Sequence, residues 1–99
     1  MWNVDPSRMC RRHLLGEHVE CHMFVGVLNK GISVTGYLNN GLLEIHNLRK
    51  RHDELVVEML KRGYSHNKKL PEFKEKVMGS IDTNINAAEL KKRCKECTF

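Results

Sequence analysis

The residues best suited to chemistry lie between positions 12 and 20, in the segment RHLLGEHVE. Its two carboxylates and two histidines fall within about three turns of a predicted helix, where residues three or four apart share a face. A carboxylate at an accessible position can transfer protons in a reaction. Most glutamates are ordinary surface groups, so two interpretations of Glu20 stay open, catalytic or merely solvated. Glu17 is interpreted as a supporting, buried structural acid that His13 either orients or packs against.

Cysteines and histidines could also bind a metal. Cys94 and Cys97 form a C-x-x-C near the carboxyl end, and His18 and His22 are four residues apart on one predicted helix. A closed zinc site needs four ligands, and one C-x-x-C supplies two. We therefore assign no metal ligands, and we keep a zinc site made of Cys94, Cys97 and two histidines as an alternative. Cys10 and Cys21 are expected to be small apolar groups within a helix.

Length and composition limit the class of protein. The chain has 99 residues, 40% of them hydrophobic, which predicts one folded domain spanning residues 1–99. No apolar run approaches the roughly 20 residues of a membrane-spanning helix, and no secretory signal is visible, so a cytoplasmic protein without a membrane partner is expected. The net charge of +5 favours a polyanionic partner, with nucleic acid the first candidate.

Hydrophobic periodicity predicts the elements that must position these residues. Asp5 and Pro6 are typical of a helix start, and the first helix is expected from residue 7 to about 29, before the stop at Gly31. Residues 31–40 are expected to form a loop.

Two further helices are expected. The second is predicted to include the apolar positions from Leu42 to Met59 and to end at Arg62-Gly63, with its charged residues, Arg51 among them, facing solvent. A short helical turn is possible around residues 72–77, and a third helix starts near Asp82. The predicted fold is all-α, a single compact domain of three main helices with long connecting loops.

Two segments carry a resemblance to a known family. Residues 12–20 resemble the first-helix motif Q-H-L-(L/M)-(G/A)-E-(H/Y)-R-E of the pyrimidine-dimer DNA glycosylases of the phage endonuclease V type. Residues 48–64, which include LRKRHDEL and LKRGY, resemble the second-helix segment L-R-K-R-x-x-E-L…L-K-R-G-(F/Y) of that family. The order and the spacing of the two motifs also agree, and the resemblance covers roughly residues 2–70.

This resemblance implies an all-helical DNA repair enzyme, a DNA N-glycosylase with an associated AP-lyase step. The α-amino group of Met1 would attack C1′ of the damaged nucleotide and form a Schiff base, and Glu20 would assist. An α-amino group has an ordinary pKa of about 7.7–8.0, so part of it is neutral and nucleophilic at pH 7. No cofactor and no metal are implied.

The implied partner is double-stranded DNA, damaged or abasic, bound by a monomer in a bacterial cell or in the host cytoplasm of a phage. Basic side chains are expected to grip phosphates around the lesion. The expected DNA-binding residues are Arg8, Arg11, Arg12, His13, Lys68 and Lys69, with Glu17 and His18 in supporting roles.

Three departures from the family pattern motivate a second hypothesis. Trp2 stands where family members expose a threonine, so Met1 is expected to be retained, and the short amino-terminal segment leaves open whether its amine reaches Glu20. Val19 and Met23 stand where arginines contact DNA, and the tail KKRCKECTF lacks the family's aromatic residues. The alternative is a catalytically inactive DNA- or protein-binding module on the same fold.

Overall fold

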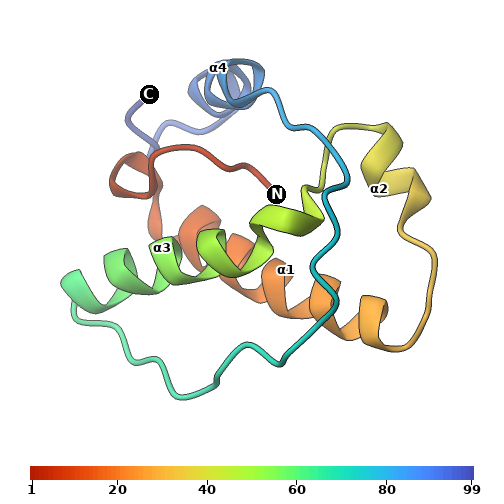
Figure 1. Cartoon of the computed structure of the whole chain (residues 1–99). Coiled ribbons are helices and arrows are strands. Elements are labelled where there is room, and N and C mark those ends of the chain that lie inside the picture. The colour runs from red at the N-terminus through yellow and green to blue at the C-terminus, as the bar shows by residue number, and fades with distance from the viewer.

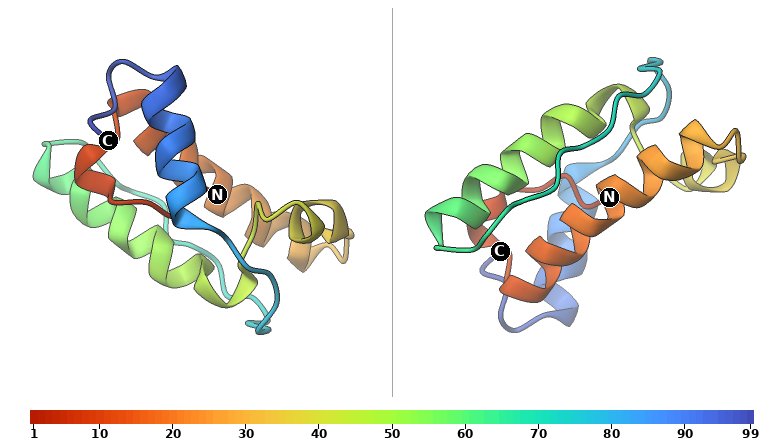
Figure 2. Two further views of the ribbon diagram at one scale, coloured as in Figure 1. Left: turned by 90° about the horizontal axis from the view of Figure 1, so that it is seen from above. Right: turned by 90° about the horizontal axis from the view of Figure 1, so that it is seen from below.

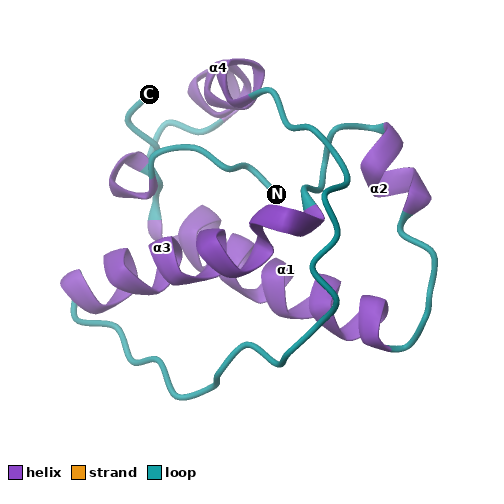
Figure 3. Cartoon of the chain, viewed as in Figure 1, coloured by secondary structure: helices purple, strands orange, loops and turns teal.

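The computed structural model describes all residues, 1–99, and contains helices and loops but no strand (Figure 3). The predicted all-α fold is confirmed. Its elements, labelled in Figure 1, are α1 (Arg11–Asn29), α2 (Thr35–Asn39), α3 (Leu48–Lys61) and α4 (Thr83–Arg93), with 3₁₀ turns at Pro6–Arg8 and Ile45–Asn47. No helix is long and apolar enough to cross a membrane.

The first helix begins later than its sequence suggests. Asp5 caps only a 3₁₀ turn, by accepting from the Ser7 N–H, and Cys10 then has extended backbone with φ −69° and ψ 165°. Cys10 is the N-cap of α1, where its thiol accepts from the His13 N–H. The prediction that Cys10 lies inside the helix is therefore wrong, whereas Cys21 is fully buried in the core as expected.

The second long helix is also shorter than predicted. It begins at Leu48, and the chain before it turns so that Leu43 is fully buried while Leu42 is 44% exposed. Residues 31–40 contain the short helix α2, and residues 72–77 form no helical turn. The predicted end of the second long helix at Arg62-Gly63 is confirmed, because Arg62 is the C-cap of α3 and Gly63 follows it with φ 84°. The predicted start of the third helix near Asp82 is also confirmed, because the Asp82 carboxylate caps the start of α4.

The long helices α1 and α3 pack on each other at the centre of the molecule. One face of this pair carries the amino-terminal segment and α4, and the connection between α3 and α4 crosses the other face (Figures 1 and 2). The connection is tied to both helices, because the Asn29 side chain donates to the Glu72 carbonyl and Arg49 donates to the Pro71 carbonyl. The core between the layers includes Leu14, Phe24, Leu43, Leu48, Leu55 and Leu90, all fully buried.

The end of this connection passes very close to the chain before α3. Gly79 has φ 94°, a conformation that residues with a Cβ rarely adopt, and a Cβ at this position would clash with the Leu43 carbonyl oxygen. The close approach is held by the Ile45 N–H, which donates to the Met78 carbonyl at 3.0 Å, and by the Ile81 N–H, which donates to the Glu44 carboxylate at 2.8 Å.

Replacing Gly79 with alanine is expected to destabilise the protein. The unfavourable φ alone costs about 1–3 kcal/mol, and the clash with Leu43 adds to it. Urea unfolding measures the change. Gly16→Ala is the control: nothing lies within 4 Å of its Cβ position in α1, so alanine there should stabilise by about 0.5–1 kcal/mol. Equal unfolding midpoints for Gly79→Ala and the wild type would contradict the close approach.

Candidate active site

The amino-terminal amine lies in contact with a carboxylate of α1. The Met1 nitrogen forms an ion pair with Glu20 Oε1 and donates a hydrogen bond to the Leu42 carbonyl at 3.0 Å. Met1 itself is buried, with 6% of its surface exposed, whereas the Glu20 side chain is 34% exposed. The amine therefore contacts Glu20, which answers the question that the sequence left open. The pair is accessible to solvent through the partly exposed Glu20 side chain.

Helix α4 holds the segment that carries the amine. The Asn86 side chain donates to the Trp2 carbonyl at 2.8 Å, and the Arg93 guanidinium lies over the Trp2 ring, 5.2 Å from its centroid. The same ring packs against His13 in a T-shaped arrangement, with 5.8 Å between centroids. Trp2 thus anchors the chain next to the amine, a role that a threonine at this position would not fill.

A buried ion pair fixes the same segment from the other side. Arg51 donates to both carboxylate oxygens of Glu17, at 2.6 and 2.9 Å, and to the Val4 carbonyl at 2.6 Å. The Asn3 N–H donates to Glu17 at 3.3 Å. Burial opposes the charge of Arg51, but its bonds to Glu17 outweigh burial and raise the pKa of the guanidinium. The pair links α1 and α3 to residues 3 and 4.

This pair corrects one expectation from the sequence and rules out one of the two alternatives for His13. Arg51 is 1% exposed and does not face solvent, and Glu17 is oriented by Arg51, not by His13. Glu17 is buried, as the sequence led us to expect of a structural acid. Helical spacing was a signal for the burial of Arg51, because position 51 lies three residues after Leu48 and four before Leu55, on the face that both leucines bury.

The basic residues expected to bind DNA are spread over two faces. Arg8, Arg11 and Arg12 are exposed around the start of α1, and Arg11 also lies over the Tyr64 ring at 5.3 Å. Lys68 and Lys69 are exposed on the connection that crosses the opposite face from Met1 (Figure 2). The structure therefore groups the three arginines and does not bring the two lysines to the amine.

The expected site histidines belong to two different clusters. His13 Nδ1 lies 3.1 Å from Cys10 Sγ and 3.5 Å from Cys97 Sγ, beside Cys94. The pairing of Cys94 and Cys97 with two histidines is therefore wrong: their neighbours are one cysteine and one histidine. The sequence has the same spacing twice, C-x-x-H at residues 10–13 and C-x-x-C at residues 94–97, and this repetition could have predicted that the four residues form one cluster.

His18 is packed among three other histidines, His22, His52 and His66. Burial and then these neighbours lower the pKa of His18 to about 4, so its ring is neutral at pH 7. His52 comes from α3, where the sequence placed it in an apolar stripe, and His66 comes from the connection after α3. No local pattern predicted the approach of His66.

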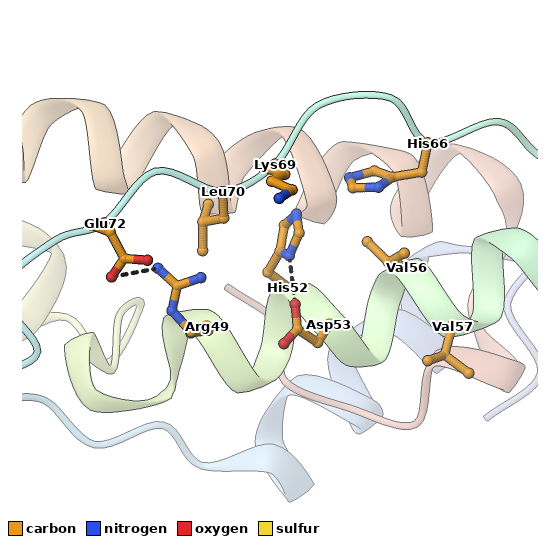
Figure 4. Close-up of a pocket in the computed structure, with 9 residues that line it drawn as sticks. All are labelled: Arg49, His52, Asp53, Val56, Val57, His66, Lys69, Leu70 and Glu72. Atoms are coloured by element: carbon orange, nitrogen blue, oxygen red, sulfur yellow. Dashed lines mark hydrogen bonds and ion pairs between the residues drawn. The ribbon is translucent and has the colours of Figure 1, made fainter.

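An open pocket lies beside these histidines, between α3 and the connection (Figure 4). The side chain of His52 points toward the connection, near His66 and Lys69, and its Nδ1 lies 3.0 Å from Asp53 Oδ1. At one end of the pocket Arg49 pairs with Glu72 at 3.7 Å. The pocket faces away from Met1 and Glu20, so it is not the site of the amine.

Comparison with known protein families gives one match. The family model described as pyrimidine dimer DNA glycosylase matches residues 1–72 of this chain, a segment that includes the amine, α1 and α3. No curated protein and no solved structure matches the chain.

Proposed function

Since the chain belongs to the pyrimidine dimer DNA glycosylase family, we propose that it excises a damaged base and then cleaves the strand at the resulting abasic site. The Met1 amine is the nucleophile, and Glu20 is the group that moves protons. The observation that carries this proposal is the contact between the Met1 nitrogen and Glu20, at a position where the amine is held by a backbone carbonyl from a remote part of the chain.

The two partners of the amine suit a nucleophile. A neutral amine has two hydrogens and one lone pair. With one hydrogen directed to the Leu42 carbonyl and the other to Glu20, the lone pair stays free to attack C1′. The rigid attachment of residues 2–4 through Asn86 and Arg51 reduces the entropy that the reaction has to overcome.

The chemical steps balance with these two groups. The amine forms a bond to C1′ as the bond from C1′ to the base breaks, and the base leaves with the electron pair and takes up a proton. The nitrogen passes a proton to Glu20, and Glu20 delivers it to O4′ as the C1′–O4′ bond breaks, which opens the sugar ring and gives the protonated Schiff base. Loss of a C2′ proton then expels the 3′ phosphate by β-elimination, and water hydrolyses the imine to release the enzyme.

DNA binding follows from the family, and the exposed arginines at the start of α1 are the proposed phosphate contacts. Extrusion of a nucleotide costs least where base pairing is already weak, as at a dimer or an abasic site. We propose damaged or abasic duplex DNA as the substrate, bound by a monomer.

The direct test is borohydride trapping on a duplex with one abasic site. Reduction of the Schiff base should leave a covalent complex that peptide mass spectrometry maps to the α-nitrogen of Met1. A variant with Lys68→Ala and Lys69→Ala is the control, because it removes the two exposed lysines of the connection and should still give the adduct. An adduct on a lysine, or none at all from folded protein, would refute the amine mechanism.

The second candidate function is non-catalytic DNA binding on the same fold. Two apolar side chains flank Glu20 on α1, Val19 with 64% and Met23 with 37% of its surface exposed, where family members have arginines. Retention of abasic duplex in a gel-shift assay, without cleavage or a trapped adduct, would favour this candidate.

A further inference from the structure

Two clusters of metal-ligating side chains lie outside the amine site. One consists of Cys10, His13, Cys94 and Cys97, and the other of His18, His22, His52 and His66. Within each cluster the four ligand atoms all lie within 4.8 Å of one another. The eight side chains come from segments far apart in the sequence, so local structure alone does not account for their convergence.

We propose that Cys10, His13, Cys94 and Cys97 bind a structural Zn²⁺ ion. Tetrahedral zinc has Zn–S bonds of about 2.3 Å and Zn–N bonds of about 2.0–2.1 Å, which place two sulfurs about 3.8 Å apart and a sulfur and a nitrogen about 3.6 Å apart. The Cys94 and Cys10 sulfurs are 3.8 Å apart, and His13 Nδ1 lies 3.1 and 3.5 Å from the sulfurs of Cys10 and Cys97. Two of these three separations match the edges of such a tetrahedron, the Cys10–His13 separation is shorter, and all four ligand atoms are close enough to share one ion.

The surroundings also suit thiolate ligands. The Cys10 N–H donates to Cys97 Sγ at 3.2 Å, and the His13 N–H donates to Cys10 Sγ at 3.5 Å. Such backbone bonds stabilise negative sulfur and orient it toward an ion. A disulfide is a poorer explanation, because bonded sulfurs are about 2.05 Å apart and all four cysteines are free.

The position of this site gives it a structural role. Cys10 caps the start of α1 and His13 lies in its first turn, whereas Cys94 and Cys97 follow the end of α4, so an ion joins the carboxyl-terminal tail to the first long helix. The tail has no regular structure of its own, and small domains often use a metal where the core is limited. If the proposed amine chemistry holds, the ion also steadies Met1, because His13 packs against Trp2.

A different observation points to a second ion at His18, His22, His52 and His66. The Nε2 atoms of all four rings are buried and have no hydrogen-bond partner. One buried polar atom without a partner costs about 1–3 kcal/mol, and four that converge at one place need a common partner. Imidazole nitrogens are good ligands for zinc.

The second site also has the support expected of metal-bound histidine. His52 Nδ1 lies 3.0 Å from the Asp53 carboxylate, an arrangement that leaves Nε2 without a proton and free to bind an ion. His18 and His22 are four residues apart on one face of α1, so their rings can bind the same ion. With His52 on α3 and His66 on the connection, this ion would join three segments across the face opposite Met1.

Elemental analysis of the full chain, purified under reducing conditions without chelator, tests both sites. We expect two zinc ions per chain in the wild type. The double variant Cys94→Ser, Cys97→Ser and the double variant His18→Gln, His22→Gln should each retain one. Cys21→Ala and His46→Gln are the matched controls, since Cys21 and His46 lie outside both clusters, and both should retain two ions.

Cobalt spectroscopy of the wild type keeps the test independent of variant folding and of any activity on DNA. Co²⁺ added to metal-free protein should give tetrahedral d–d bands for two equivalents, and thiolate-to-metal charge transfer for only one of them. A single equivalent with charge transfer would overturn the four-histidine site, and a single equivalent without it would overturn the cysteine site. Folded wild-type protein that binds neither metal would overturn both.

Discussion

Replacing Glu20 with glutamine is expected to reduce strand cleavage at an abasic site by about 10²–10⁴-fold, the usual contribution of a positioned acid-base group. The amide keeps the size of the side chain and can still accept a hydrogen bond from the Met1 amine. It cannot take up the proton that the amine releases when it bonds to C1′, so the chemical step slows while DNA binding stays near the wild-type level. Single-turnover cleavage kinetics with saturating enzyme measure this step directly.

The control for this variant is Glu75→Gln, which makes the same change of charge at an exposed position of the connection after α3. It should cleave at the wild-type rate. Equal loss in both variants would point to net charge, and wild-type cleavage by Glu20→Gln would remove Glu20 from the mechanism. Loss of cleavage together with a normal thermal unfolding curve identifies a catalytic effect and not a folding defect.

Replacing Arg51 with alanine is expected to lower the free energy of unfolding by about 3–5 kcal/mol, because the Glu17 carboxylate is left charged and unpaired in the core. A domain of this size has about 5–15 kcal/mol in total, so a large part of its stability is lost. Urea unfolding monitored by circular dichroism gives the change. Arg49→Ala, on the same helix but in a partly exposed pair with Glu72, should cost no more than about 1 kcal/mol.

A double variant separates stability from positioning. In Glu17→Leu with Arg51→Met no buried charge remains, and such replacements are often neutral or stabilising. We expect it to be much more stable than Arg51→Ala. It also loses the bonds to the Asn3 N–H and the Val4 carbonyl, which hold the segment behind the Met1 amine, so borohydride trapping should fall although the protein is folded. Full trapping by this variant would show that Asn86 and Trp2 suffice to place the amine.

The sequence by itself determined the helical class and the helix ends near Asn29, Arg62 and Asp82. Turn and cap residues act over four or five positions, so Gly63 and Asp82 mark the end of α3 and the start of α4 without reference to the rest of the chain. The resemblance at residues 12–20 made Glu20 the catalytic candidate, and Glu20 is the carboxylate that pairs with the Met1 nitrogen. The start of α1 was misplaced because Asp5 and Pro6 are good capping residues that here serve only a 3₁₀ turn.

Only the tertiary structure decided which distant groups meet. The Met1 nitrogen contacts both Glu20 and the Leu42 carbonyl. Arg51 belongs to a stretch of charged residues, yet its side chain is buried and pairs with Glu17. The same holds for the two metal clusters, which draw ligands from both ends of the chain and from the connection after α3. Periodicity shows which face of a helix is buried, but the packing of α1 on α3 and the folding of both termini over that pair decide which residue lies opposite.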